Sequence, residues 1–115
     1  MRRGEVYWAT FEPRSGSEQK GRRPAIVVSS DGFNLTPSWR SVMVLPLTTA
    51  GAQARRGPTA VELEAGAGGL PGRGFALCHQ ITTLDRAKLV GRLGTLSAEE
   101  LGRVEAGIRL ALDLP

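Results

Sequence analysis

The 115-residue sequence has a single cysteine, Cys78, and a single histidine, His79. One cysteine excludes a disulfide within the chain, and one Cys with one His cannot form a four-ligand Cys/His zinc site. No apolar run reaches the roughly 18 residues that a membrane-spanning helix needs, and the first four residues do not lead into a signal-peptide core. We therefore expect a soluble cytoplasmic protein without a Cys/His zinc site, and we also expect no cofactor.

Aromatic residues are also scarce, at 5%, but hydrophobic residues make up 41% and charged residues 23% of the chain. These two fractions are near the globular average and exclude a disordered chain. The length suits one domain over residues 1–115. Fifteen glycines and seven prolines imply many turns, which favours a turn-rich β fold over a helical bundle.

Lysine is rare, since thirteen of the fifteen basic residues are arginine. Residues 1–56 hold nine basic and four acidic side chains, net +5, whereas residues 57–115 hold six basic and seven acidic, net −1. Arginine is favoured where planar donors bind phosphate or stack on bases, but a GC-rich genome produces the same bias. The basic first half indicates a nucleic acid or an acidic partner.

Short apolar or alternating segments predict six strands. They lie at residues 4–11, 24–29, 41–47, 59–63, 75–84 and 88–93. Pro46 inside the third strand predicts an edge strand or a bulge, because proline has no N–H to donate. We place Trp8 of the first strand in the core.

Between the strands lie two polar loops, residues 12–23 and 48–58, and a turn-like segment at 31–38. The glycine-rich segment 65–74 lacks the spacing and the lysine of a phosphate loop, so we interpret it as a connection. Trp39 follows the turn, and its ring either packs locally or stacks on a base.

The end of the chain carries a well-defined helix signal. Ser97 and Glu100 have the spacing of a capping box, and Leu96 and Leu101 stand at hydrophobic-staple positions. An apolar stripe follows, formed by Leu101, Val104, Ile108 and Leu112. Two glycines in the helix weaken it by roughly 1 kcal/mol each relative to alanine. Together the elements predict a small antiparallel β-barrel closed by a C-terminal helix.

Five sequence blocks resemble, in order and spacing, those of the MazF/PemK/Kid toxins. They are Arg3–Tyr7 (RGEVY), Gly16–Gln19 (GSEQ), Gly21–Pro24 (GRRP), Pro46–Thr49 (PLTT), and Cys78–Ile81 (CHQI) continued by Thr83–Asp85 (TLD). The resemblance covers essentially the whole chain. It implies a mainly β fold with a C-terminal helix, the small SH3-like barrel of PemK-type proteins.

The resemblance further implies the toxin of a type II toxin–antitoxin pair, a homodimer that cuts single-stranded RNA at a short sequence without metal. By the same resemblance Arg23 is catalytic and Thr48 is its partner at the scissile phosphate. The expected partners are the RNA substrate and an antitoxin whose disordered acidic tail folds along the basic groove.

The chemistry of the residues fits such a reaction. In metal-free cleavage the 2′-OH of RNA attacks the neighbouring phosphorus, so the protein must move protons and stabilise phosphoryl charge. Arg23 suits charge stabilisation and protonation of the leaving oxygen, and Thr48 can donate one hydroxyl hydrogen bond. The alternatives are an exposed structural arginine and a strand-end threonine.

His79 departs from the family pattern. Some members carry an acidic residue at this position, proposed as the general base, with an arginine two residues earlier; here the residues are His79 and Leu77. Imidazole is a competent base near neutral pH. The alternative is a hydrogen-bonded core histidine, because His79 falls on the same strand face as Phe75, Leu77 and Ile81.

Eight further residues are candidates for contact with RNA, with solvated loops or ordinary strand positions as the alternative. They are Ser17, Glu18, Gln19, Arg22, Thr49, Arg55, Arg56 and Gln80. The amide and carboxyl groups would read base edges or hold Arg23, and the arginine pair would steer phosphates.

Two other functions stay open at this point. One is a non-enzymatic toxin that resembles the gyrase poison CcdB, although the helix end lacks a distinctive tip and the GSEQ and GRRP blocks favour the ribonuclease. The other is an RNA-binding barrel that does not cleave, since a fold alone never establishes chemistry.

Overall fold

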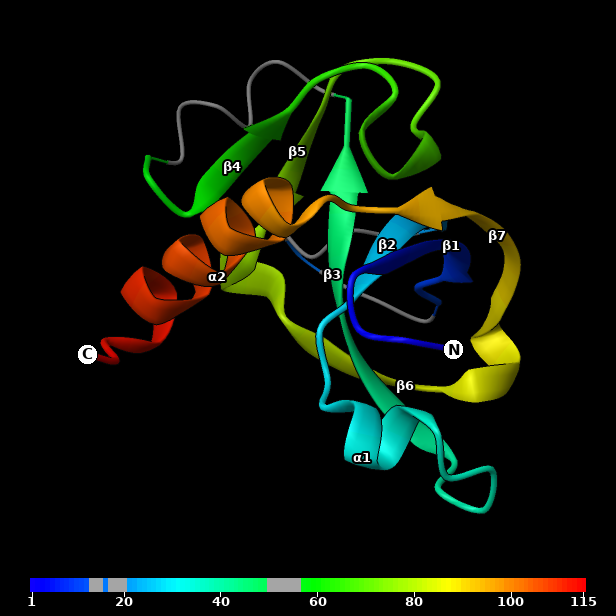
Figure 1. Cartoon of the computed structure of the whole chain (residues 1–115). Coiled ribbons are helices and arrows are strands. Elements are labelled where there is room, and N and C mark those ends of the chain that lie inside the picture. The colour runs from blue at the N-terminus through cyan, green and yellow to red at the C-terminus, as the bar shows by residue number, and fades with distance from the viewer. Residues whose placement is uncertain (13–15, 17–20, 50–56) are drawn as a thin grey trace.

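The computed structural model describes residues 1–12, 16, 21–49 and 57–115. In these residues seven antiparallel strands form one sheet, with a helix packed across it (Figure 1). The strands are β1 (Glu5–Thr10), β2 (Arg22–Val27), β3 (Ser41–Thr48), β4 (Ala60–Leu63), β5 (Gly74–Leu77), β6 (Thr82–Asp85) and β7 (Leu89–Thr95). The helices are α1 (Asp31–Asn34), α2 (Ala98–Leu112) and the 3₁₀ turns η2 (Ala67–Gly69), η3 (Cys78–Gln80) and η4 (Arg86–Lys88).

Strand β3 is the centre of the sheet, whose order is β4-β5-β3-β2-β1-β7. One edge of β3 pairs with β2, whereas the other edge is divided between two strands. Residues 41–44 of that edge pair with β6, and residues 47–48 pair with β5. Three strands thus depend on β3, which Figure 1 shows running through the length of the molecule.

Pro46 lies in this central strand, so the predicted edge strand or bulge is wrong for β3 as a whole. Pro46 is paired with Ala25 of β2. On the opposite edge it falls between the stretch paired with β6 and the stretch paired with β5. The missing N–H of proline costs no ladder hydrogen bond at such a break.

The predicted closed barrel is also corrected, because within the described part of the chain the sheet ends at β4 on one side and at β7 on the other. The cause lies in residues 75–84, which form no single strand. The turn η3 interrupts them, so β5 and β6 pair with different halves of β3. The sheet therefore divides at β3 instead of closing, while the mainly β class with a C-terminal helix is confirmed.

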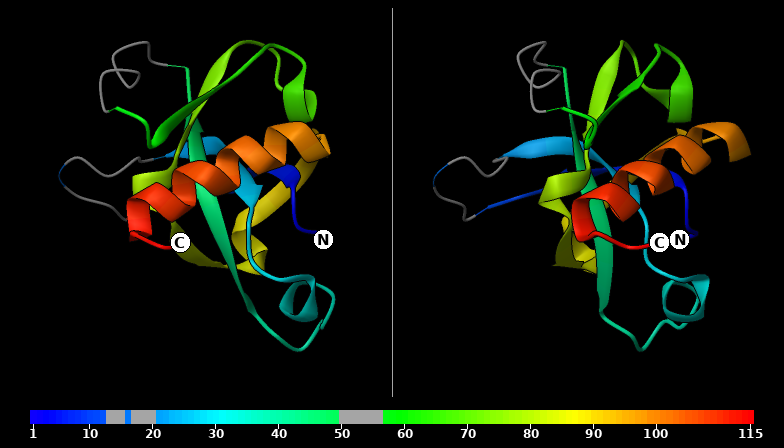
Figure 2. Two further views of the ribbon diagram at one scale, coloured as in Figure 1. Left: turned by 60° about the vertical axis from the view of Figure 1, so that its left-hand side comes forward. Right: turned by 90° about the vertical axis from the view of Figure 1, so that its left-hand side faces the viewer.

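Two apolar clusters form on opposite faces of β1, β2 and β3, as the period of two in a strand requires. One is covered by α2, η2 and β4 and contains Val6, Ile26, Leu45, Leu47, Leu63, Leu70 and Val104. The other lies under β6 and β7 and contains Ala9, Phe11, Ala25, Val27, Val42, Val44, Leu84 and Leu89. Figure 2 shows α2 crossing one side of the sheet. The central strands are therefore buried on both faces.

Helix α2 begins as the sequence predicts. The Ser97 hydroxyl accepts a hydrogen bond from the Glu100 N–H at 3.1 Å, and the Glu100 carboxylate accepts one from the Ser97 N–H at 2.8 Å. Val104 is fully buried, but Leu112, the last member of the predicted stripe, is 49% exposed. The stripe therefore packs over the first three turns, and the helix end extends past the sheet.

The predicted turn at residues 31–38 contains the one-turn helix α1, capped by the Ser30 side chain. Trp39 packs on Phe33 with 4.9 Å between ring centroids. The Arg86 guanidinium donates hydrogen bonds to the carbonyls of Phe33 and Thr36, at 2.6 and 3.0 Å. Local packing of Trp39 is thus confirmed, although its side chain is half exposed.

Of the helices in the described ranges, none has the length and hydropathy to cross a membrane.

The two glycines of α2 differ in their surroundings, which generates a matched prediction. A Cβ at Gly107 would lie 2.7 Å from Cys78 Sγ and 2.8 Å from Val61 Cγ2, whereas one at Gly102 meets no atom within 4 Å. Both alanine variants gain the same helix propensity, but only Gly107→Ala overpacks the core. We expect its free energy of unfolding, measured by urea denaturation, to lie about 1–3 kcal/mol below that of Gly102→Ala. Equal values would show that the helix is not closely packed here.

Candidate active site

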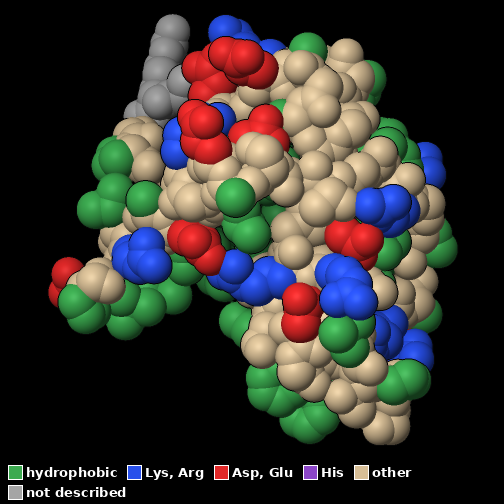
Figure 3. All heavy atoms as spheres, in the orientation of Figure 1, with side chains coloured by type: hydrophobic (Ala, Val, Ile, Leu, Met, Phe, Trp, Pro, Cys, Tyr) green, Lys and Arg blue, Asp and Glu red, His purple; other side chains and the backbone are tan. Residues whose placement is uncertain are grey.

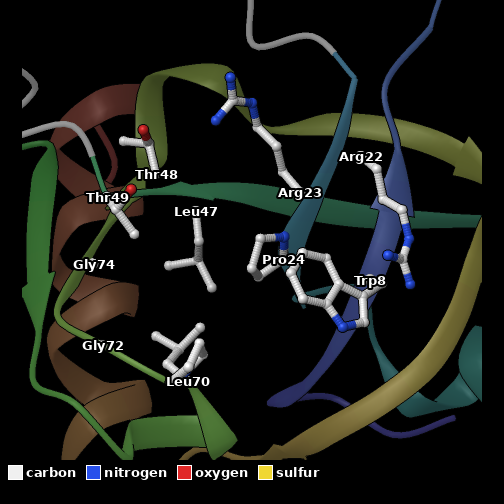
Figure 4. Close-up of a pocket in the computed structure, with 11 residues that line it drawn as sticks. Trp8, Arg22, Arg23, Pro24, Leu47, Thr48, Thr49, Leu70, Gly72 and Gly74 are labelled. Atoms are coloured by element: carbon white, nitrogen blue, oxygen red, sulfur yellow. The ribbon is translucent and has the colours of Figure 1, made fainter.

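A pocket of about 230 Å³ lies where β2 begins and β3 ends (Figure 4). Antiparallel pairing places these two strand ends side by side. Strand β1 adds Trp8, because it is paired with Pro24. The lining residues are Trp8, Arg22, Arg23, Pro24, Leu47, Thr48, Thr49, Leu70, Pro71, Gly72 and Gly74. The pocket therefore combines parts of the chain that are far apart in sequence.

The walls of the pocket are largely apolar. Leu47 and Leu70 belong to the cluster under α2 and are nearly fully buried. Figure 4 shows them facing Pro24 and Trp8 across the cavity. The pocket thus lies at one end of the apolar cluster under α2, where neither the helix nor the sheet covers the cluster completely.

Charge in the pocket is of one sign, since the described residues that line it include two arginines and no Asp or Glu. Arg23 is half-buried, paired with Ala9 of β1, and Thr48 ends β3 with only 4% of its surface exposed. Figure 4 shows the Arg23 guanidinium and the Thr48 hydroxyl on the same side of the cavity. A forked cationic donor beside a hydroxyl is a suitable site for an anionic oxygen such as that of a phosphate.

The glycine-rich segment 65–74 forms one side of this pocket. Gly74 opens β5, which pairs with the end of β3, and a Cβ at Gly74 would lie 3.4 Å from the Thr48 carbonyl oxygen. The absence of a side chain at Gly74 therefore leaves room beside Thr48. This segment is a connection, as predicted, but it also lines the site.

His79 lies elsewhere. It is exposed on η3, and its Nδ1 is 2.9 Å from the Thr59 hydroxyl oxygen, with which it shares a hydrogen bond. The alternative of a hydrogen-bonded core residue is confirmed for the hydrogen bond but wrong for the burial, because η3 breaks the strand alternation on which the predicted burial depended. The pocket lining does not include His79 or its half-buried neighbour Gln80.

The remaining predicted RNA contacts divide into two groups. Arg22 and Thr49 are exposed and line the pocket. Five others lie outside the described residues: Ser17, Glu18, Gln19, Arg55 and Arg56. The structure thus brings Arg22, Arg23, Thr48 and Thr49 together.

Sequence reasoning missed the apolar part of the pocket. It placed Trp8 in the core, but the indole is half-buried at the pocket, with the Arg22 guanidinium carbon 4.6 Å from the ring centroid. A hairpin register with Trp8 opposite Pro24 would have placed it beside the GRRP block. Hydrophobic periodicity predicts that the Trp8 side chain faces inward. It does not show that the neighbouring elements leave this side chain only partly buried.

The side of the molecule that α2 crosses is not uniformly basic. Figure 3 shows Asp and Glu side chains interspersed with Lys and Arg on it. Arg3 forms an ion pair with Glu105 of α2 at 2.5 Å. Mixed charges of this kind do not attract a polyanion along the whole face. The pocket, with two arginines among its described lining residues, is the better candidate for an anion.

The fold and the pocket define a class: a small antiparallel β protein in which two arginines line a largely apolar pocket. The model of the PemK-like, MazF-like toxins of type II toxin–antitoxin systems matches residues 2–112. The chain belongs to this family.

Curated relatives match over nearly their whole length. The chain is 37% identical to endoribonuclease MazF9 of Mycobacterium tuberculosis over 117 residues, covering 99% of this chain and 98% of that protein. It is 32% identical to endoribonuclease EndoA of Bacillus subtilis over 115 residues, covering 99% and 96%.

Solved structures agree with the fold. MazF from Deinococcus radiodurans superposes with a TM-score of 0.79 at 29% identity, covering 99% of this chain and 97% of that chain. A mycobacterial endoribonuclease in complex with its cognate antitoxin gives a TM-score of 0.80 at 25% identity, covering 100% and 97%. The predicted family and fold class are thereby confirmed.

Cys78, next to His79, is shielded from thiol chemistry. Its side chain is fully buried, and burial raises the pKa of the thiol to about 11. Since the thiolate is the reactive form, we expect Cys78 of the folded protein to react with Ellman's reagent at pH 8 at least ~100-fold more slowly than in 8 M urea. Labelling at the same rate in both conditions would contradict this burial.

Proposed function

We propose that this family member is a sequence-specific endoribonuclease that needs no metal ion and acts as the toxin of a type II toxin–antitoxin pair. The observation that carries the proposal is the joint presence of Arg23 and Thr48 at one pocket, whose described lining residues include no Asp or Glu. The endoribonuclease names of the relatives support the same activity. We further propose that residues 1–115 act as one domain.

The reaction we propose uses the substrate's own nucleophile. The 2′-oxygen forms a bond to phosphorus and the bond from phosphorus to the 5′-oxygen breaks, which leaves a 2′,3′-cyclic phosphate and a 5′-OH. Arg23 stabilises the negative phosphoryl oxygens and protonates the leaving oxygen, while Thr48 donates one hydrogen bond. DNA lacks the 2′-OH and is not a substrate.

The proton of the 2′-OH needs an acceptor, and Arg23 does not fit this role because a guanidinium stays protonated near pH 7. His79 is the predicted candidate, with an imidazole suited to neutral pH. Its ring, however, is held by Thr59 and does not line the pocket. We therefore propose that His79 takes no direct part in the reaction and that a water molecule accepts the proton of the 2′-OH.

Recognition of the RNA is assigned to the rim and the neighbouring loops. Arg22 and Thr49 stand at the pocket, and Gln80 follows His79 on η3. Ser17, Glu18, Gln19, Arg55 and Arg56 complete this proposal from the sequence alone. Their mixture of cations and amides suits splayed single-stranded bases and their phosphates.

The partners follow from the same assignment. We propose a homodimer inhibited by an antitoxin whose acidic tail binds at Arg22 and Arg23, the cations at the pocket. The mycobacterial structure with its cognate antitoxin supports an antitoxin partner. Cleavage of mRNA would place the activity in the cytoplasm. Family membership favours this reading over a CcdB-like gyrase poison.

Cleavage by the purified protein tests the assignment of Arg23. With a long single-stranded RNA in EDTA, we expect discrete fragments with 5′-OH ends from the wild type and no cut in an all-DNA copy. Arg23→Ala removes the stabilising cation, so its rate should fall by about 10²–10³-fold or more. Arg40→Ala is the control, because Arg40 pairs with Asp85 away from the pocket. Intact RNA with the wild type would favour the non-cleaving RNA-binding alternative.

The role of His79 has a separate test. For His79→Ala we expect a kcat within about threefold of wild type, and an unchanged pH profile, because the ring lies outside the pocket. The measurement is the single-turnover rate between pH 5 and 8. A fall of about 10²–10⁴-fold, with loss of the acidic limb of the rate profile, would identify His79 as the general base instead.

A further inference from the structure

The pocket contains more apolar surface than the binding of a phosphate requires. Arg23 and Thr48 supply donors for anionic oxygens, but Trp8, Pro24, Leu47, Leu70 and Pro71 offer no charged group. Apolar walls with a few polar groups at the mouth are typical of sites for small organic ligands. The apolar part therefore calls for an occupant other than the phosphate.

Trp8 is fixed in place by its two neighbours on β2. It is paired with Pro24, and the Arg22 guanidinium carbon lies 4.6 Å from the centroid of its ring. In Figure 4 Pro24 lies toward Leu47, whereas Arg22 lies on the outer side of the indole. A cation over an indole is attracted to the ring electrons. Arg22 therefore orients the Trp8 ring from its outer side and leaves the other side of the indole toward the cavity.

We propose that this cavity is a subsite for one unpaired RNA base, next to the phosphate that is cut, with Trp8 as its main contact. The inference rests on the proposed ribonuclease function. The base packs its apolar faces against Trp8, Pro24, Leu47 and Leu70, and its polar edge stays at the mouth beside Thr49. Arg22 is a positioning residue that acts through the indole.

The size and the surroundings favour a single base. A volume of about 230 Å³ is below the roughly 300–1,000 Å³ of drug-sized ligand pockets and leaves space for one flat ring system. Aromatic side chains stack on unpaired bases in general. The cations at the rim place the phosphate that joins this base to its neighbour.

The experiment uses a short RNA that spans the mapped cleavage site, with a 2′-deoxy sugar at the cut position so that it binds without reacting. Loss of a base–aromatic contact should weaken binding of this RNA by Trp8→Ala about 5- to 150-fold. Trp8→Phe keeps an aromatic ring, so binding should stay within a few-fold of wild type. Trp39→Ala is the matched control, because Trp39 precedes β3 whereas the pocket lies at the other end of that strand.

An abasic scan of the same RNA makes the test specific. One position should lose as much affinity as Trp8→Ala when its base is removed, and combining the two changes should produce no additional loss. In a Trp39→Phe protein, where Trp8 is the sole tryptophan, the intact RNA should change the fluorescence and the abasic RNA should not. Thermal unfolding of each variant identifies losses caused by misfolding.

Three outcomes overturn the proposal in different ways. If the wild type cleaves RNA but Trp8→Ala binds it unchanged, or if the losses from Trp8→Ala and every abasic site are additive, the base subsite is wrong and the ribonuclease stands. If Trp8→Ala weakens only an acidic antitoxin peptide, the cavity is a peptide site. If the wild type neither binds nor cleaves RNA, the proposed function fails as well.

Discussion

The division of one edge of β3 between β5 and β6 is the constraint on which the rest of the structure depends. Pro46 marks the break, and the chain must turn at η3 to leave one half of β3 and pair with the other. That turn moves His79 out of any strand alternation, and it also lets β5 cover the end of β3 at Thr48. The position of the pocket is therefore a consequence of how a single strand shares its hydrogen bonds.

Much of this arrangement is predictable from local sequence. The capping box at Ser97, the buried strand after the GRRP block and the proximity of Arg23 to Thr48 follow from patterns that operate over a few residues or from family blocks. The environment of Trp8 and the break within residues 75–84 are not predictable in this way. They depend on which strand end is left uncovered and on where a strand changes partner. Both are tertiary properties, and hydrophobic periodicity is insensitive to them.

In the proposed function and base subsite, the pocket places two kinds of recognition side by side. Contacts from arginine to phosphate provide affinity that weakens with salt and contains no sequence information, whereas contacts to a base contribute selectivity. Arg22 belongs to both, since its charge adds to the potential at the rim while its guanidinium covers the Trp8 ring. Binding strength and base preference are therefore coupled at this residue, so that a change at Arg22 alters both together.

Strand β1 is synthesised well before its second neighbour, β7, which comprises residues 89–95. Until those residues leave the ribosome, one edge of β1 has unpaired N–H and carbonyl groups beside the fully buried Val6 and Ala9. An incomplete chain thus exposes an unpaired strand edge and lacks the pairing of Trp8 with Val90 of β7. An unpaired edge of this kind is a template for pairing with another chain, so a fragment that ends before β7 is prone to aggregation.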